Sequence, residues 1–312
     1  MLPKKVTIHE AGPREGFQFE PIVLPTRTKV EFIEALARTG LTDIEVASFV
    51  RPDLVPQMAD AEELVAQLTP YPGVTYTASY LNVKGLERAS KTGKLRLKHG
   101  LTISASETFS RRNQHADHAE AYLGLEKRAD LFCSWGISGV SLGIAAAFGC
   151  NFEGDIPLAN VLDWIRRLEH LALSKGLAPE EIRLLDTMGW ANPRGITEAV
   201  EAIYTLWPGI PVSLHLHDTR GLGMANAYAA LVLGVSDFDT AVAGLGGCPF
   251  GGHTGAAGNL ATEDFVLMCH EMGIETGVDL DALIECANSA EILVGHALPG
   301  KVKVGGNLSR YR

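Results

Sequence analysis

The chain has 312 residues, of which 46% are hydrophobic, 21% charged and 7% aromatic, and its formal net charge is −10. This composition suits a folded protein with a sizeable core and excludes an intrinsically disordered or collagen-like chain. The acidic balance argues against a general nucleic-acid-binding protein, and no apolar run reaches the roughly 18 residues of a membrane helix.

Short β-branched runs alternate along the chain with longer segments of helical period. Strands are predicted at residues 6–11, 43–49, 74–80, 97–104, 139–146, 182–188, 212–218 and 238–243. Amphipathic stretches follow them, for example at 29–38, 61–68, 161–173, 197–206, 225–233 and 263–272. Several of these strands are apolar on both faces, which is typical of a parallel sheet covered by helices.

Eight β–α units in about 275 residues are the number and length of a (β/α)8 TIM barrel, an α/β fold. A doubly wound open sheet is the alternative, but no GxGxxG motif follows the first strand. We expect a catalytic barrel over residues 1–276 and a C-terminal helical extension, residues 277–312, packed on it. Barrel enzymes carry their chemistry at the carboxyl ends of strands, so unusual polar residues there are the candidates for a site.

The seventh predicted strand carries His215 and His217. Residues i and i+2 of a strand face the same side, so both imidazoles point the same way. A pair of hydrogen-bonded interior histidines is the alternative interpretation. Glu15 after the first strand and Asn259 after the eighth add oxygen donors, and two nitrogens with several oxygens but no thiolate favour Mg²⁺ or Mn²⁺.

A glycine-rich loop, residues 244–259, follows the eighth predicted strand and contains Cys248; seven of its sixteen residues are glycine. Such a loop approaches a ligand closely or moves, and a thiol within it can donate or accept a proton. The remaining cysteines are expected to be buried or bystanders. Because no CxxC pair and no signal-peptide pattern occur, we expect a reducing compartment and a cytoplasmic location.

Charged residues also follow or lie on other predicted strands. Arg14 comes just after the first strand and could stabilise an enolate or a carboxylate. Glu45 lies on a strand that should be buried, where an unpaired carboxylate is expensive, so it is expected to bind Arg14. Asp186 ends the sixth strand and is a candidate general base or acceptor for a metal-bound histidine. Capping of the helix that begins near Asn192 is the alternative for Asp186.

The segments GPREGFQFE, IEVASFVRPDLVPQMAD, DTMGWANP, LHLHDTRGLGMANAYAAL, AVAGLGGCPF and GNLATED together resemble the 3-hydroxy-3-methylglutaryl-CoA lyase family. This family belongs to the metal-dependent barrel lyases and Claisen synthases that include isopropylmalate synthase. The resemblance runs from about residue 6 to residue 297. The GLGGCP loop is its most specific part, because related synthases share the HxH pair but lack this cysteine loop.

The resemblance implies both the site residues and the reaction. The implied metal ligands are Glu15, His215, His217 and Asn259; the implied catalytic residues are Cys248, Arg14, Glu45 and Asp186. The implied reaction is retro-Claisen cleavage of 3-hydroxy-3-methylglutaryl-CoA, or a close 3-hydroxy-3-alkylglutaryl-CoA, to acetyl-CoA and a β-keto acid. Arg14 would stabilise the thioester enolate and Cys248 would protonate it, while Asp186 or His215 would take the C3 hydroxyl proton.

The chain departs from the family pattern at three places. Glu15 stands where the family usually has aspartate, the segment between Cys248 and Asn259 is two residues longer than usual, and Pro299 replaces a common asparagine. An acyl-CoA substrate also needs cationic and polar contacts. The residues expected to provide them, besides Arg14, are Ser48, Arg111, Arg112 and Lys301.

Three alternatives to this function stay open. The enzyme could be a citramalyl-CoA-type lyase, or an aldolase or synthase of the same barrel group that acts on a free 2-keto acid. It could also be a catalytically silent barrel that senses metal or acyl-CoA. We expect an acyl-CoA thioester partner and a homodimer, the latter by analogy, and neither nucleic acid nor membrane as a partner.

Overall fold

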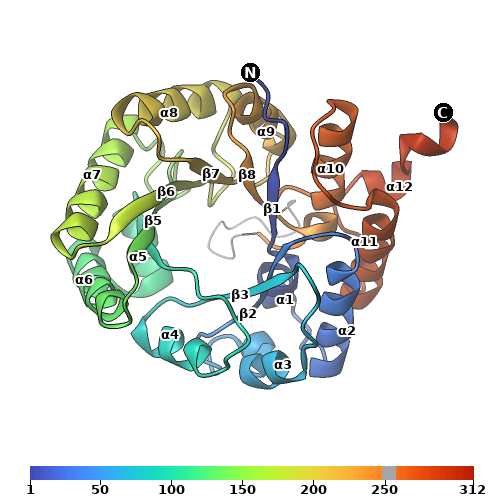
Figure 1. Ribbon diagram of the computed structural model, residues 1–312, viewed down its shortest axis with the longest axis horizontal. Helices are drawn as coiled ribbons and strands as arrows, with labels where there is room; N and C mark the ends of the chain where they lie inside the picture. The colour runs from blue at the N-terminus through green and yellow to red at the C-terminus, as the bar shows by residue number, and fades with distance from the viewer. Residues whose placement is uncertain (248–257) are drawn as a thin grey trace. The chain divides into compact units, whose positions relative to one another are not determined.

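The computed structural model describes residues 1–247 and 258–312, which belong to two compact units that interleave along the chain. Among the described residues, unit 1 comprises 1–2 and 99–237, and unit 2 comprises 3–98, 238–247 and 258–312. Figure 1 shows the strands and helices in chain order by colour. Within the described ranges, none of the helices has both the length and the apolar character needed to cross a membrane.

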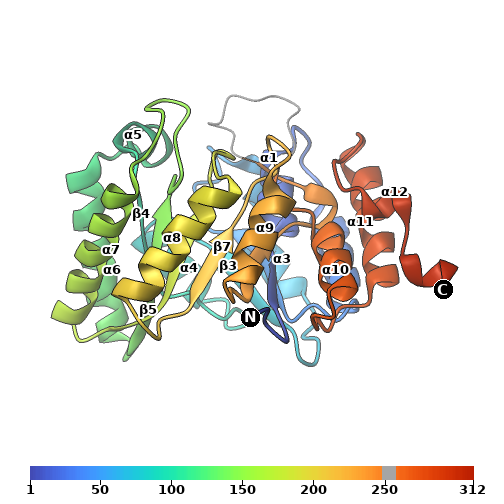
Figure 2. The same ribbon diagram turned by 90° about the horizontal axis from the view of Figure 1, so that it is seen from above.

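Unit 2 contains four neighbouring strands in the order β3-β2-β1-β8: β1 (Thr7–Glu10), β2 (Asp43–Ser48), β3 (Thr75–Ser79) and β8 (Asp237–Thr240). The pairs β1–β2 and β2–β3 are parallel. Its helices are the short α1 (Phe17–Phe19), then α2 (Thr26–Ala37), α3 (Ala61–Gln67), α4 (Val83–Ser90), α10 (Thr262–Glu271), α11 (Leu280–Val294) and α12 (Val302–Gly305). Helix α11 packs against α2 and α10, and α10 and α11 lie side by side in Figure 2.

Unit 1 contains the other four strands in the order β7-β6-β5-β4, all parallel: β4 (Gly100–Ser104), β5 (Gly139–Ala145), β6 (Ala178–Leu185) and β7 (Val212–His215). Its helices are α5 (Glu107–Gln114), α6 (His118–Ser134), α7 (Leu158–Ser174), α8 (Pro193–Leu206) and α9 (Gly223–Val232). Helices α6, α7 and α8 lie along one side of β5 and β6 (Figure 1).

Local sequence signals explain where these helices begin and which face they bury. Helix α6 begins with a complete capping box, in which Asp117 accepts from the N–H of Glu120 and Glu120 accepts from that of Asp117. Helix α7 buries residues at helical spacing: Val161, Trp164, Ile165, Leu168, Leu171 and Ala172. This apolar stripe packs α7 against β5 and β6.

The predicted alternation of eight strands and helices in an α/β fold is confirmed, with differences at the ends of strands. Strand β6 begins at Ala178, earlier than expected, because its first half alternates exposed and half-buried residues and so lacks an apolar run. It ends at Leu185, which leaves Asp186 in the following turn. Strand β7 ends at His215, so His217 lies just beyond it. The domain boundary after residue 276 stays a prediction.

The N-cap of α11 provides a test of this local account. Asp279 accepts hydrogen bonds from the N–H groups of Asp281 and Ala282 at 3.0 and 3.1 Å. Asp279→Ala should therefore lower the free energy of unfolding by about 1 kcal/mol in urea denaturation. Glu285→Ala, an exposed change on the same helix, is the control and should have little effect. Equal stability of both variants would contradict the capping role.

Candidate active site

The turn after β1 carries Arg14 and Glu15 and is a π-helical turn, Gly12–Gly16. The N–H groups of Arg14 and Glu15 both donate to the carbonyl of Ala11, at 3.1 and 2.7 Å. A Cβ added at Gly16 would lie 2.6 Å from Cβ of Leu245, so no residue larger than glycine fits there without a shift. This tight turn presents two charged side chains at the carboxyl end of β1.

Arg14 is held by two carboxylates of unit 2. Its Nε donates to Glu45 Oε1 at 2.9 Å, its Nη2 donates to Glu45 Oε2 at 3.3 Å, and Nη2 lies 3.1 Å from Glu15 Oε2. Burial alone would lower the pKa of Arg14, but the charges of Glu45 and Glu15 outweigh it and raise the pKa above its ordinary value. The third nitrogen, Nη1, makes no hydrogen bond with any described residue. Arg14 is therefore a cation in a fixed position whose Nη1 N–H groups can donate to a ligand. Its expected pairing with Glu45 is confirmed.

Glu15 and Asn259 form a buried pair within unit 2. The Nδ2 of Asn259 donates to Glu15 Oε1 and to the carbonyl of Leu245, both at 3.0 Å. These bonds orient the amide so that Oδ1 of Asn259 is buried with no hydrogen-bond partner among the described residues. An orphaned buried carbonyl oxygen beside a carboxylate fits a bound hard cation.

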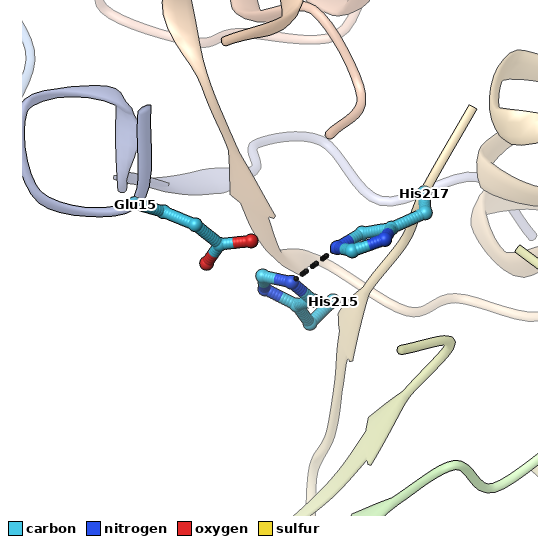
Figure 3. A group of neighbouring side chains, drawn as sticks. All are labelled: Glu15, His215 and His217. Carbon is cyan, nitrogen blue, oxygen red and sulfur yellow. Dashed lines mark hydrogen bonds between the residues drawn. The ribbon is translucent and has the colours of Figure 1, made fainter. Parts of the chain in front are cut away.

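His215 and His217 form the corresponding pair within unit 1, and Figure 3 draws them together with Glu15. Both imidazoles are buried, and their Nε2 atoms lie 3.0 Å apart. The expectation that they face the same side is thus confirmed. Two ligands at neighbouring positions of an octahedral ion, each about 2.1 Å from it, are separated by about 3.0 Å. The pair therefore fits two ligands of Mg²⁺ or Mn²⁺, although one shared proton could also join them.

Asp186 lies in the turn after β6, beside the histidine strand. Its backbone N–H donates to the carbonyl of His215 at 2.8 Å, and its Oδ1 accepts from the N–H groups of Trp190 and Ala191 at 2.7 and 3.0 Å. Oδ2 is buried with no partner in the described part of the chain. Burial raises the pKa of Asp186 to about 6, opposed by His217 and the two backbone donors. Asn192, not Asp186, caps the following helix.

The predicted proton donor, Cys248, lies outside the described residues, which stop at Gly247 and resume at Gly258. The flanking glycines are in close contact with the Glu15–Asn259 pair and with each other. A Cβ added at Gly246 would lie 2.7 Å from Nδ2 of Asn259, and one added at Gly258 would lie 1.7 Å from the carbonyl oxygen of Gly246. Both positions therefore require glycine: Gly246 has a positive φ of 90° and packs against the Asn259 side chain, and Gly258 packs against the backbone of Gly246.

The four other residues expected to bind substrate lie in different surroundings. Ser48 is buried at the end of β2. Arg111 is paired with Glu107 at 2.7 Å and Asp117 at 3.4 Å, and the Arg112 guanidinium lies 4.1 Å from the ring centre of Phe152. Lys301 has a side chain that is 73% exposed, while its N–H donates to Asp264 at 2.9 Å. Their role in substrate binding stays a prediction.

Two buried glutamates that the sequence analysis missed anchor the backbone around the site in unit 2. Glu10 Oε1 accepts from the N–H groups of Gly12 and Val242 at 2.8 and 2.9 Å, and Glu263 Oε2 accepts from that of Ala243 at 2.9 Å. Burial raises the pKa of Glu10 to about 7 and that of Glu263 to about 8. The sequence signal that could have found them is the position of each glutamate: Glu10 ends an apolar strand, and Glu263 follows Asn259 by four residues.

The chain is similar to known proteins over most of its length. The model of the HMGL-like family matches residues 5–289. The hydroxymethylglutaryl-CoA lyase YngG of Bacillus subtilis is 38% identical over 96% of both chains, and the mitochondrial hydroxymethylglutaryl-CoA lyase of Homo sapiens is 37% identical over 92% of this chain and 85% of the relative. The structure of an HMG-CoA lyase from Acinetobacter baumannii in complex with coenzyme A and 3-methylmalate has a TM-score of 0.87 and 36% identity, covering 97% of this chain and 96% of that one.

The raised pKa of Glu263 predicts a pH dependence of stability. Its ordinary pKa of 4.5, expected in the unfolded chain, rises to about 8 in the folded protein. The folded state therefore binds more protons between these values, so the free energy of unfolding falls as the pH rises through this range. In Glu263→Gln, which cannot ionise, this fall between pH 5.5 and 8.5 should be smaller by roughly 3 kcal/mol, since the folded state holds the extra proton over about 2.5 pH units of this range and each unit corresponds to about 1.4 kcal/mol.

Urea denaturation at the two pH values measures this difference, with the exposed Glu285→Gln as the matched control. Parallel pH dependence in the parent and Glu263→Gln would show that Glu263 is ionised in the folded protein throughout.

Proposed function

Because the chain belongs to the HMGL-like family, we propose that it is a metal-dependent carbon–carbon lyase that cleaves 3-hydroxy-3-methylglutaryl-CoA. The products would be acetyl-CoA and acetoacetate, or another β-keto acid from a close 3-hydroxy-3-alkylglutaryl-CoA. The observation that carries this proposal is the Arg14 guanidinium, fixed by Glu45 and Glu15 with its Nη1 donors unused by any described residue.

We infer that the two sets of four strands close into one (β/α)8 barrel, with residues 277–312 as a C-terminal extension. The eight β–α units in chain order and the similarity to lyase structures over nearly the whole chain support this inference. In such a barrel the carboxyl ends of all strands meet on one face. A cytoplasmic location and a homodimer remain predictions.

We further propose that Glu15, His215, His217 and Asn259 together bind one divalent cation, Mg²⁺ or Mn²⁺. The orphaned Oδ1 of Asn259 and the 3.0 Å separation of the two Nε2 atoms support it, each within its own unit. When bound, the cation would supply Lewis acidity at the C3 oxygen and the terminal carboxylate of the substrate. Glu15 reaches farther than the family's aspartate, and its hydrogen bond from Asn259 sets the direction of its carboxylate.

Arg14 would act on the thioester half of the substrate. Cleavage of the C2–C3 bond moves its electron pair onto C2, which creates a thioester enolate. The unused N–H groups of Arg14 can donate to the enolate oxygen, and they do so without reorganisation because Glu45 holds the guanidinium in advance. A cation fixed in this way stabilises developing negative charge more than it stabilises the neutral thioester.

Asp186 would take the proton from the C3 hydroxyl. Its Oδ2 is unpartnered among the described residues, and its pKa of about 6 leaves it ionised yet basic at neutral pH. His215 is the alternative acceptor. Cys248 would then protonate C2 of the enolate to release acetyl-CoA, since it follows Gly247 directly in the chain and Gly246 contacts Asn259.

A citramalyl-CoA-type lyase is the second candidate function. The 3-methylmalate named with the Acinetobacter baumannii lyase is a hydroxy dicarboxylate, and a citramalyl group is a close relative of it with the same functional groups. The same residues would then release acetyl-CoA and pyruvate. The two candidates differ only in the substituent at C3, which the shared chemistry does not distinguish.

A substrate panel separates these candidates. With Mg²⁺ or Mn²⁺ present, we expect 3-hydroxy-3-methylglutaryl-CoA to release acetyl-CoA with a higher kcat/KM than citramalyl-CoA or longer 3-alkyl homologues. Coupled detection of acetyl-CoA measures each reaction. A higher kcat/KM for citramalyl-CoA would establish the second candidate, and no release from any thioester would contradict the lyase assignment.

Cys248→Ser tests the proton donor. Loss of the thiol should lower kcat by roughly 10²–10⁴-fold, the usual contribution of a positioned general acid or base, while metal affinity stays the same. Cys133→Ser is the matched control, because Cys133 is exposed on α6 and should have no effect. Turnover of Cys248→Ser at the parent rate would exclude this role.

A further inference from the structure

A second set of charges lies around Asp43, the first residue of β2, in the same unit as the Arg14–Glu45 pair. Asp43 and Glu45 are two residues apart on β2, so their side chains lie on the same face of the strand. Asp43 is buried and lies 3.1 Å from His9 Nδ1, 2.5 Å from Arg96 Nη2 and 3.7 Å from Lys98 Nζ. Burial alone would raise the pKa of Asp43, but the hydrogen bond from His9 and the charges of Lys98 and Arg96 hold it well below its ordinary value.

Lys98 is the cation that links this set to the site. Its Nζ lies 3.7 Å from Asp43 Oδ1 and 4.0 Å from Glu45 Oε2. Glu45 Oε2 is also the oxygen that accepts the longer of the two hydrogen bonds from Arg14, at 3.3 Å. Lys98 and Arg14 therefore act on the same carboxylate oxygen.

The backbone around Lys98 is hydrogen-bonded to β3 and to Tyr80, the residue after β3. The N–H of Arg96 donates to the carbonyl of Tyr76 at 2.9 Å, and the hydroxyl of Tyr80 donates to the carbonyl of Lys98. The side chain of Lys98 is 26% exposed, so its charge is only partly screened by solvent. The position of Nζ is thus set by the fold and by two carboxylates.

Lys98 is near both carboxylates, whereas Arg96 pairs with Asp43 alone among the described residues. Without Lys98, the Asp43 and Glu45 carboxylates would face each other on one side of the strand, with no cation from the described part of the chain near both. Residues i and i+2 of a strand are about 6.5–7 Å apart, a distance at which like charges in a poorly hydrated interior repel each other. The Glu45 carboxylate would then shift away from Asp43 and toward Arg14. We expect the guanidinium to move with it, because its Nε and Nη2 both donate to Glu45, while only Nη2 also lies near Glu15.

We propose that Lys98 is a positioning residue for Arg14, which acts through Glu45 and is anchored by Asp43. This proposal deepens the proposed function and rests on it for the effect on turnover. Its geometric part concerns only where the guanidinium lies, so it is testable without turnover.

Lys98→Met in the full chain removes the charge and keeps most of the apolar stem. We expect its crystal structure to show the Arg14 guanidinium displaced relative to the parent, and kcat to fall about tenfold with little change in KM, since Arg14 acts mainly on the enolate. Lys98→Arg should retain most of the turnover. Arg96→Met is the matched control, because Arg96 binds Asp43 but makes no contact with Glu45 among the interactions described, and it should leave kcat near the parent value.

Introducing Lys98→Met into the Arg14→Lys variant tests whether Lys98 positions Arg14 or supports the structure in general. If Lys98 acts only through Glu45 and Arg14, adding Lys98→Met to Arg14→Lys should lower kcat less than twofold further. An unmoved guanidinium in the Lys98→Met structure would overturn the proposal whatever the turnover. A multiplicative loss of kcat in the double variant, or a loss matched by Arg96→Met, would also overturn it. If the parent itself cleaves no thioester, the proposed function fails while the crystal structures still decide the positioning.

Discussion

Burying charged groups in an α/β core is costly unless each group gains a partner, and this constraint organises both units. In unit 2, the half-buried Arg14 lies between two carboxylates, and the buried Asp43 lies among cations. In unit 1, two buried imidazoles face each other, and Asp186 accepts two backbone hydrogen bonds. Two of the buried atoms that have no partner among the described residues, Oδ1 of Asn259 and Oδ2 of Asp186, are the ones to which we assign a metal ion and a proton.

The buried carboxylates divide into two chemical classes according to their neighbours. Burial raises the pKa of Asp186 to about 6, and that of Glu10 and Glu263 to about 7 and 8. These groups can exchange protons near neutral pH. Asp43, surrounded by cations, has a lowered pKa and stays ionised. One fold thus provides both a proton acceptor and fixed negative charges, because the neighbours of each carboxyl differ.

The sequence predicted the eight strands and the pairing of Arg14 with Glu45 because both follow from short-range pattern and from the cost of an unpaired buried charge. It also predicted that His215 and His217 face the same side, a consequence of strand geometry. It did not predict the anchoring of backbone by Glu10 and Glu263. Their partners are the backbone N–H groups of Val242 and Ala243, which carry no side-chain signal, and Val242 is also distant from Glu10 in the sequence. Nor did it predict Lys98, whose neighbours Asp43 and Glu45 are brought to it by strand pairing rather than by sequence spacing.

The most direct test of the central claim is the stoichiometry of Mn²⁺ binding, followed by electron paramagnetic resonance in the parent, His217→Ala and Asn259→Ala. If both donor pairs hold one ion, the parent should bind one tightly held Mn²⁺ per chain, and each substitution should weaken that same ion. Unchanged binding in Asn259→Ala, or two independent ions per chain, would show that the histidine pair and the Glu15–Asn259 pair do not form a single metal site.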